Sequence, residues 1–465
     1  MKLFIRKETG TLNKPVHLVL LFACIVSVTA ACGGGAGFGS ENGAKPEEKS
    51  PAVADKEKPP AEPEKTAKPV TLNIFQTISN SRTQEWFDET YGNKIKAKFP
   101  HLTLNFIPRG PGQTEKELVA TGQPIDMMMV SQSQTFSAFI EYRLQSDISD
   151  LIKTYKYDLS KLFPATVDIQ KAISGGEAIY GLPVVMNAAP FFYNKDLFDK
   201  FGVPYLNDNM TWDDIYEVAR KLTRNEGGVQ YRGLVMNTTL SVEKNQLSLS
   251  YVDPKTNKAF VDERWRKWTE VMTRFFTIPG NQMDAKTVNG TAQSNMFGKD
   301  KIAAMYASRG NPNLTAWDMN WDMIAFPTFP EAPGVGPQAT PTYAYVTHTS
   351  KHRDEAFQVI QFLTSEDIQM ARSRLGDGTV LQNAAIQQAF GSDVPQYKGK
   401  NIKAVVPKQY AKPMAQTDYN AIGLKQYLNA FDQVAIGNKD VNTALREAAE
   451  SAEKEIEAMK TANAK

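Results

Sequence analysis

Two histidines in the motif HTSKH have the spacing that comes closest to a catalytic metal site in this sequence. His348 and His352 stand four residues apart, the interval at which two imidazoles on one face of a helix can bind the same zinc ion. The HExxH motif also needs a glutamate directly after the first histidine, and Thr349 stands there instead. Ser350 is a preferred helix N-cap, which places the pair across a boundary between a strand and a helix. We therefore expect no metal site here.

Catalytic motifs of other kinds are missing from residue 32 onward. That part of the sequence holds no GxSxG nucleophile elbow, no P-loop and no CxxC pair. Four histidines and two cysteines in the whole chain leave little material for metal or thiol chemistry. Paired carboxylates leave no short motif, so a secreted carbohydrate-active enzyme stays open as the first alternative to a binding protein. Nothing in these residues calls for a cofactor, so we expect none.

Composition and charge bound the class of protein. With 465 residues, of which 42% are hydrophobic and 22% charged, the chain can bury a large core. Its length favours about two or three folded units. The formal net charge of +2 gives neither the basic field that nucleic-acid binding needs nor an acidic excess for a cationic partner. We therefore expect no nucleic-acid partner.

The N-terminal residues have the organisation of an export signal. Four basic residues precede an apolar run over residues 17–31, which is too short and wrongly flanked to remain as a spanning helix. Ala30 and Ala31 directly before Cys32 resemble the bacterial lipobox, in which diacylglycerol alkylates the cysteine before the signal is removed. Thr29 stands where that motif usually has leucine. We predict a signal peptide over residues 1–31 and a lipid-modified Cys32; an ordinary signal peptide with a stray cysteine is the alternative.

Residues 32–69 have the composition of a disordered tether. Glycine, proline, lysine and glutamate dominate, and large apolar residues are too few to form a core. Signal removal takes away four positive charges and one negative charge, which changes the formal charge from +2 to −1. Cys24 leaves as well, so Cys32 remains as the one thiol and no internal disulfide is expected. Two acyl chains give stable anchoring, so the predicted location is the extracytoplasmic face of the cell membrane.

Strands and helices alternate from Val70 onward. Residues 71–75 and 102–107 are predicted as strands, and residues 82–99 and 114–123 as helices. Residues 125–130 form an apolar run without alternation, as expected of a parallel strand that is covered on both faces. This order predicts an α/β fold with doubly wound sheets.

A strand-rich stretch in the middle of the chain suits a rigid connection between two folded units. The strand-like segments YGLPVVM and FFYN are followed by a helix over residues 195–202, and then by a capping box at Thr211 and Asp214. Gly181 allows unusual backbone dihedrals, whereas Pro183 fixes φ. Two units that close on a ligand need more than one such crossing, because a single flexible linker would leave their relative motion unrestricted.

The order of these motifs resembles that of extracellular solute-binding proteins of ABC importers, in the sugar-binding group related to maltose-binding protein. Four further segments agree with the family in the right order, so that the resemblance covers nearly the whole folded chain: residues 121–131, 295–310, 343–365 and 437–456. The resemblance implies a two-lobed, periplasmic-binding-protein-like (type II) fold, with a first crossing at YGLP and a second at residues 340–346. Lobe 1 would comprise residues 70–184 and 346–395, and lobe 2 residues 185–345 and 396–465.

Polar residues at the carboxyl ends of the predicted strands are the candidate ligand contacts. Ligands of open α/β sheets meet the loops at these ends, and the family resemblance selects the same places. Most of these side chains are uncharged, which suits a small, neutral, hydroxyl-rich solute, and one arginine could fork across two oxygens. The candidates are Gln76, Ser79, Asn80, Ser131, Gln132, Asn187, Thr238, Thr239, Ser308, Arg309, Tyr343 and Tyr419.

Tryptophans are common stacking platforms for a sugar ring, so their positions limit which sugars could bind. Trp212 belongs to a capped helix, and Trp265 and Trp268 have a spacing typical of core packing. Trp86 in the first predicted helix could reach the cleft. In maltose-binding protein a tryptophan closely follows the strand that corresponds to IAAMY, whereas here no aromatic residue comes before Trp317. This departure disfavours malto-oligosaccharides.

We therefore expect a monomeric, lipid-anchored receptor that binds a sugar or an oligosaccharide between two lobes. The resemblance implies that it delivers the solute to the transmembrane permease subunits of an ABC importer. A lipoprotein that keeps the fold and presents solute to a signalling partner is the second alternative. Closure on a ligand without turnover would separate a receptor from an enzyme, and pairing with a permease would separate it from a sensor.

Overall fold

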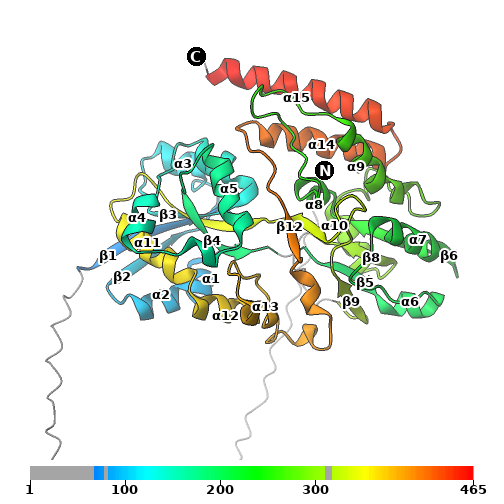
Figure 1. Ribbon diagram of the computed structural model, residues 1–465, viewed down its shortest axis with the longest axis horizontal. Helices are drawn as coiled ribbons and strands as arrows, with labels where there is room; N and C mark the ends of the chain where they lie inside the picture. The colour runs from blue at the N-terminus through cyan, green and yellow to red at the C-terminus, as the bar shows by residue number, and fades with distance from the viewer. Residues whose placement is uncertain (1–67, 78–81, 188, 309–316, 464–465) are drawn as a thin grey trace, which may run out of the picture. The chain divides into compact units, whose positions relative to one another are not determined.

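The computed structural model describes residues 68–77, 82–187, 189–308 and 317–463. The predicted signal peptide, Cys32 and nearly all of the predicted tether lie outside these ranges. Ser79, Asn80 and Arg309 also lie outside them. Within the described ranges the chain has a mixed α/β fold with two five-stranded sheets and one two-stranded sheet (Figure 1). No helix in these ranges is long and apolar enough to cross a membrane.

The first sheet has the strand order β2-β1-β3-β11-β4. Strands β1, β2 and β3 are parallel, and β11 enters between β3 and β4 and is antiparallel to both. The MMMV run of β3 is fully buried, as a strand covered on both faces requires. The strands are β1 (Val70–Gln76), β2 (Leu102–Ile107), β3 (Met127–Ser131), β4 (Gly181–Met186) and β11 (Pro341–Val346).

Short helices connect and cover the strands of the first sheet (Figure 1). The single helix predicted over residues 82–99 consists of α1, a π-helical turn at Asp88–Gly92 and α2 in succession. Thr114 and Glu117 close a capping box at the start of α3. The helices are α1 (Gln84–Phe87), α2 (Asn93–Lys98), α3 (Glu115–Ala120), α4 (Ser149–Thr154), α5 (Pro164–Ser174), α11 (Arg353–Leu363), α12 (Glu366–Arg374) and α13 (Ala384–Gln388).

Helix α11 begins later than the sequence suggests. Its N-cap is His352, whereas the sequence favours Ser350. The Ser350 hydroxyl donates instead to Oδ1 of Asp126 at 2.7 Å, and Oδ2 of Asp126 accepts from the backbone N–H of Asn73 in β1 at 2.8 Å. A buried carboxylate has to be hydrogen-bonded, and this demand draws Ser350 away from the helix.

The second sheet has the strand order β6-β7-β8-β5-β9. Strands β7 and β8 are parallel, and β5 is antiparallel to its neighbours β8 and β9. Gly227 and Gly228, with φ of 60° and 80°, form the turn between β6 and β7, a conformation that glycine adopts without steric cost. The strands are β5 (Phe191–Asn194), β6 (Arg224–Glu226), β7 (Val229–Met236), β8 (Ala303–Ala307) and β9 (Trp321–Ile324).

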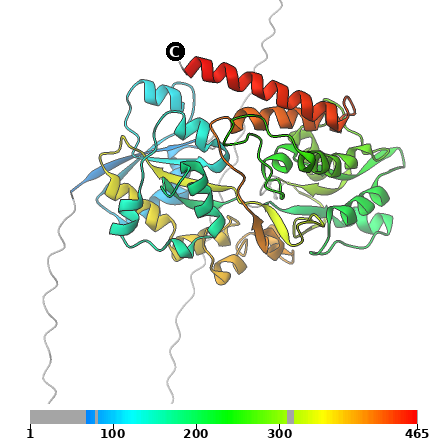
Figure 2. The same ribbon diagram turned by 45° about the horizontal axis from the view of Figure 1, so that its top comes forward.

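The helices around the second sheet include the C-terminal pair α14 and α15, which lie side by side in Figure 2. The predicted capping box at Thr211 and Asp214 starts α7. Trp212, Trp265 and Trp268 are buried in the core, as their positions suggest. The helices are α6 (Lys195–Phe201), α7 (Trp212–Leu222), α8 (Thr238–Glu243), α9 (Glu263–Thr273), α10 (Gly290–Gly298), α14 (Asn420–Ala435) and α15 (Val441–Asn463).

Two separate hydrophobic cores underlie the two sheets. The first takes its fully buried side chains from residues 72–186 and 339–386. The second takes them from residues 191–329 and 390–456. A small parallel sheet of β10 (Val335–Gln338) and β12 (Gln409–Ala411) lies where the chain passes between the cores. Two cores connected by short passages are the structural basis of a two-lobed fold.

The first passage between the cores follows the end of β4, the second precedes the start of β11, and a third lies between residues 386 and 390. Both strands lie wholly in the first sheet and pair with each other, although residues 341–345 were assigned above to lobe 2. Gly181 has an ordinary backbone φ; a Cβ there would lie 2.5 Å from the carbonyl oxygen of Ala344, so close approach of β11 explains this glycine. Pro183 is tolerated because β4 is an edge strand. We propose lobe boundaries after Met186 and before Ala339.

Candidate functional site

A polar cavity of about 340 Å³ lies at the carboxyl end of β3, beside the passages between the two cores. Its size falls within the range that small-molecule sites occupy. Its walls come from four places: the segment after β3, the end of β4, the end of α8 and the residue before β11. The lining residues are Ser131, Gln132, Ser133, Gln134, Asn187, Glu243, Lys244 and Thr340.

The wall after β3 is held by hydrogen bonds to the end of β1. Because β1 and β3 are parallel neighbours, their carboxyl ends reach the same edge of the sheet. Oε1 of Gln134 accepts from the hydroxyls of Thr77 at 3.0 Å and Ser131 at 3.2 Å. These bonds fix the orientation of the Gln134 amide. Its NH₂ group is therefore positioned as a donor in the cavity wall.

Asn187 and Thr340 bring the two passages together. The side-chain amide of Asn187 donates to the backbone carbonyl oxygen of Thr340 at 2.7 Å. The Thr340 hydroxyl is buried and has no hydrogen-bond partner in the described ranges of the chain. Leaving a buried polar group without a partner costs about 1–3 kcal/mol. A hydroxyl-bearing solute in the cavity would remove that cost.

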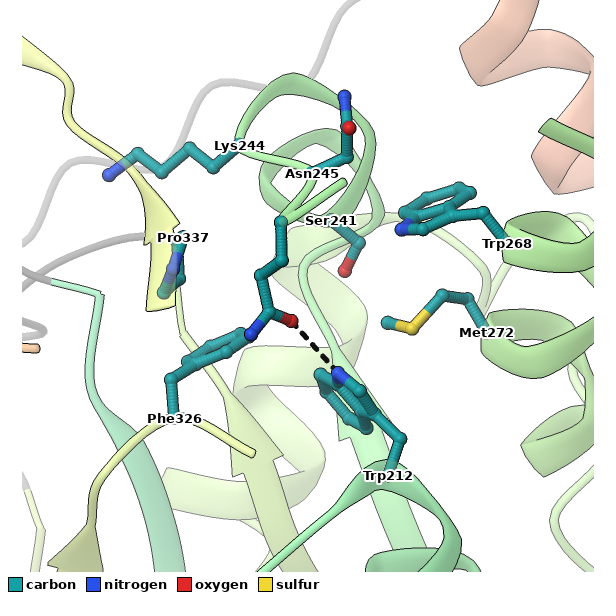
Figure 3. A pocket seen from close by; sticks show the side chains of 9 residues that line it. Trp212, Ser241, Lys244, Asn245, Trp268, Met272, Phe326 and Pro337 are labelled. Carbon is teal, nitrogen blue, oxygen red and sulfur yellow. Dashed lines mark hydrogen bonds between the residues drawn. The ribbon is translucent and has the colours of Figure 1, made fainter. Parts of the chain in front are cut away.

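The wall formed by the end of α8 carries two charged side chains, Glu243 and Lys244, which are only 7% and 5% exposed. Their backbone is anchored by two buried glutamines. Gln338 donates from its backbone N–H to the carbonyl oxygen of Lys244 at 3.2 Å, and Nε2 of Gln246 donates to the carbonyl oxygens of Pro327 and Val335. The indole N–H of Trp212 donates to Oε1 of Gln246 at 2.9 Å. In Figure 3 the Lys244 side chain extends away from Trp212.

The structure brings three of the sequence-predicted residues to the cavity: Ser131, Gln132 and Asn187. Gln76 is buried at the end of β1, next to Thr77, and its Oε1 has no hydrogen-bond partner in the described ranges. It is thus adjacent to the wall without lining the cavity. Ser308 is buried, and its backbone N–H donates to the carbonyl oxygen of Pro190 at 3.2 Å.

Three other predicted residues have structural roles away from the cavity wall. Tyr343 is fully buried in the first core, and its hydroxyl donates to the carbonyl oxygen of Thr166 at 2.6 Å, which corrects its assignment to the solute. Tyr419 precedes α14, with the ammonium of Lys460 5.8 Å from its ring centroid. Thr239 is in the first turn of α8.

Thr238, in the same turn of α8, is buried and hydrogen-bonds to Asp432 of α14. Burial raises the pKa of the Asp432 carboxyl to about 6, against the effect of the Thr238 hydrogen bond. One oxygen of this carboxyl, Oδ1, has no partner in the described ranges. The Thr238 hydroxyl therefore serves the packing of α8 on α14.

Five lining residues were missed by sequence reasoning. Ser133 and Gln134 continue the SQSQ run that follows β3, and Thr340 is the first residue of the predicted second crossing, so the sequence could have indicated these three. It could not have indicated Glu243 and Lys244, because nothing in the sequence shows that the end of α8 would face the loop after β3. That contact exists only in the tertiary structure.

In the described ranges, no group of three or more histidine, cysteine, aspartate or glutamate side chains could hold a metal ion. Trp86 is not part of the cavity wall. Its ring packs against Tyr91, Phe106 and the guanidinium of Arg82.

Comparison with known proteins places this site in a family context. The family model described as bacterial extracellular solute-binding protein matches residues 77–370. A sugar transporter from Rhizobium etli in an open conformation has a similar structure, with a TM-score of 0.66, 20% identity and coverage of 82% of this chain and 99% of that one. An ABC substrate-binding protein from Listeria monocytogenes in complex with cycloalternan gives a TM-score of 0.67 and 18% identity, with coverage of 83% and 98%. The sugar-binding protein MalE from Xanthomonas citri gives 0.64 and 14%, with coverage of 85% and 100%.

Proposed function

Because the chain belongs to the bacterial extracellular solute-binding protein family, we propose that it captures a sugar or an oligosaccharide in the cavity at the end of β3 and delivers it to the permease of an ABC importer. The observation that carries this proposal is the composition of the cavity wall. Uncharged hydroxyls and amides come from the loop after β3 and from the two passages, beside the charged Glu243 and Lys244 of the α8 wall, and the buried Thr340 hydroxyl lacks a partner in the described ranges. Such a wall offers donors and acceptors to a solute with many hydroxyls.

The proposed mechanism follows from the position of the cavity. The loop after β3 belongs to the first core, whereas α8 belongs to the second. A solute that touches both walls binds the closed arrangement more tightly than the open one, and only this difference in affinity can shift the populations. The closed form then docks on the permease, and ATP is hydrolysed by another protein.

Membrane attachment is the second part of the proposal. The lipobox-like sequence before Cys32 and the Pro- and Glu-rich segment after it support a lipid anchor followed by a flexible leash. A leash raises the local concentration of the receptor around its transporter. We further propose that the receptor acts as a monomer on the extracytoplasmic face of the membrane.

The solute class is supported by what related proteins bind. Solved relatives were crystallised with cycloalternan and with maltotetraose, and another one with D-mannitol. All three are rich in hydroxyls. The missing tryptophan after β8 argues against a simple malto-oligosaccharide in this chain, because a sugar face would lack that stacking partner.

A thermal-shift screen of mono- and oligosaccharides, with amino acids, peptides and polyols as controls, tests the proposal. A sugar should raise the melting temperature of the full-length protein, and scattering should show a more compact particle without any change in the sugar. Hydrolysis of the sugar would favour the secreted enzyme instead. Stabilisation by a peptide or an amino acid alone would refute the sugar assignment. Copurification with a signalling protein and no permease would favour the sensor.

A further inference from the structure

Two arginine side chains stacked on aromatic rings form a second polar cluster in the first lobe. The guanidinium of Arg82 lies 4.1 Å from the ring centroid of Trp86, and that of Arg372 lies 4.8 Å from the ring centroid of Tyr91. The two rings meet edge to face, with centroids 6.0 Å apart. A guanidinium on an aromatic face is held in one orientation, so its N–H fork is pre-organised.

The cluster has more donors than acceptors. Arg372 forms an ion pair with Asp377, yet its Nε is buried and without a hydrogen-bond partner. Nε of Arg82 is likewise buried and has no hydrogen-bond partner in the described ranges. A buried charged donor without an acceptor is costly, so an acceptor for these N–H groups would be stabilising.

The balance of charge in the cluster is positive. Asp377 is the carboxylate that faces both arginines, and burial raises its pKa while Arg372 and Arg82 act to lower it. Burial also raises the pKa of the Tyr91 hydroxyl, which keeps that group neutral. Among the described residues, these two guanidiniums therefore face one carboxylate.

The cluster lies at the same edge of the first sheet as the cavity. Arg82 stands shortly after Thr77, whose hydroxyl donates to Gln134 of the cavity wall. On the other side, Gly378 next to Asp377 accepts a hydrogen bond at its carbonyl oxygen from the N–H of Met186, and Asn187 of the wall follows directly. The Asp377 flank of the cluster is thus connected by a backbone hydrogen bond to the residue that precedes Asn187 of the cavity wall.

We propose that Arg82, pre-organised by Trp86 and supported by Arg372, is an anion subsite that selects acidic sugars, with a carboxylate of the solute binding the guanidinium fork. This inference rests on the proposed function and narrows it: the solute is a sugar acid, not the neutral sugar that the loop residues suggest. A planar carboxylate matches the fork in two parallel hydrogen bonds. It would also add a second carboxylate beside the two guanidiniums.

The test compares matched pairs of sugars on the full-length protein in detergent by calorimetry. The pairs are glucose with glucuronate, galactose with galacturonate, and the corresponding trisaccharides; glucose 6-phosphate tests whether a phosphate serves as well. We expect the acidic member to bind more tightly in at least one pair, and added salt to weaken that binding.

Variants of Arg82 connect this preference to the cluster. Arg82→Gln should weaken binding of the acid roughly 10- to 100-fold, as loss of a charged hydrogen bond predicts, and leave a neutral sugar unaffected. Arg82→Lys keeps the positive charge but loses the planar fork. Its affinity for the acid should therefore lie between those of the wild type and Arg82→Gln. Arg220→Gln on α7, whose side chain is 57% exposed, is the matched control and should change nothing. The melting temperature without ligand reports whether each variant is folded.

If the neutral sugar of every pair binds as tightly as the acidic one or more tightly, the anion subsite is refuted. The proposed sugar receptor would be unaffected by that result. Failure of all acids and all neutral sugars to bind would overturn both. An acid preference that survives Arg82→Gln unchanged would also refute the assignment, because the preference would then come from other residues.

Discussion

The side-chain amide of Asn187 is bonded to the backbone carbonyl oxygen of Thr340 at 2.7 Å, across the two passages that leave the first sheet. Asn187→Ala removes this bond and one polar group of the cavity wall. We expect binding of the identified sugar to weaken about tenfold, since one hydrogen bond contributes roughly 1 kcal/mol, with little loss of melting temperature. Asn438→Ala, in the loop between α14 and α15, is the control. Unchanged affinity would mean that the solute binds elsewhere.

Arg309, outside the described residues, gives a parallel test. Arg309→Ala should weaken sugar binding without loss of fold, because its guanidinium is predicted to fork across two solute oxygens. Titration calorimetry measures the change. Wild-type affinity in this variant and in Asn187→Ala together would show that the predicted contacts are misplaced.

Gly181 is a glycine whose replacement should be costly for a steric reason. A Cβ there would lie 2.5 Å from the carbonyl oxygen of Ala344 and 2.6 Å from the ring of Tyr345, so the pairing of β4 with β11 would have to shift. We expect Gly181→Ala to lower the free energy of unfolding by about 1–3 kcal/mol, as overpacking does. Gly176→Ala is the control, since nothing lies within 4 Å of its Cβ position. Equal denaturation midpoints would contradict the close approach.

Gln246 anchors the α8 side of the cavity through three hydrogen bonds, and Gln246→Met keeps its length but removes all of them. The indole N–H of Trp212 and the carbonyl oxygens of Pro327 and Val335 would lose this partner. The free energy of unfolding should fall by roughly 2–4 kcal/mol, because buried polar groups would be left unsatisfied. The same change at the exposed Gln123 should have little effect. Chemical denaturation distinguishes the two.

Asp432 makes the free energy of unfolding depend on pH. Burial raises its pKa to about 6 in the folded protein, above the value of about 3.9 for an unfolded aspartate. The folded state therefore binds the proton more tightly, and Asp432 makes stability fall as pH rises from about 4 to 6. Asp432→Asn should remove this part of the dependence and melt higher than wild type at pH 8. Asp300→Asn, at an exposed site, should leave the profile unchanged; identical profiles for wild type and Asp432→Asn would refute the assignment.

The sequence predicted those parts of the fold that depend on local pattern. The buried MMMV run follows from its apolar pattern and the capping box at Thr211 from cap chemistry. The π-helical turn at Asp88–Gly92 did not, because its apolar residues also fit an α-helix. Family resemblance supplied the two-lobed architecture, which no single segment encodes.

The candidate site was predictable only where it follows a strand end. Ser131, Gln132 and Asn187 were found in that way. Tyr343 looked equally suitable, but alternation along β11 directs its side chain into the first core. Glu243 and Lys244 reach the cavity through tertiary contacts between segments far apart in the chain. Such contacts leave no mark on local sequence.

The insertion of β11 between β3 and β4 has a consequence for synthesis. The first sheet lacks an inner strand until residue 346 has left the ribosome, by which time every strand of the second sheet has been made. The second core takes buried side chains from residues 390–456, so we expect neither lobe to be complete until late in translation. The proposed export signal would gain from this delay, because a channel that threads an unfolded chain accepts it only before the lobes have formed.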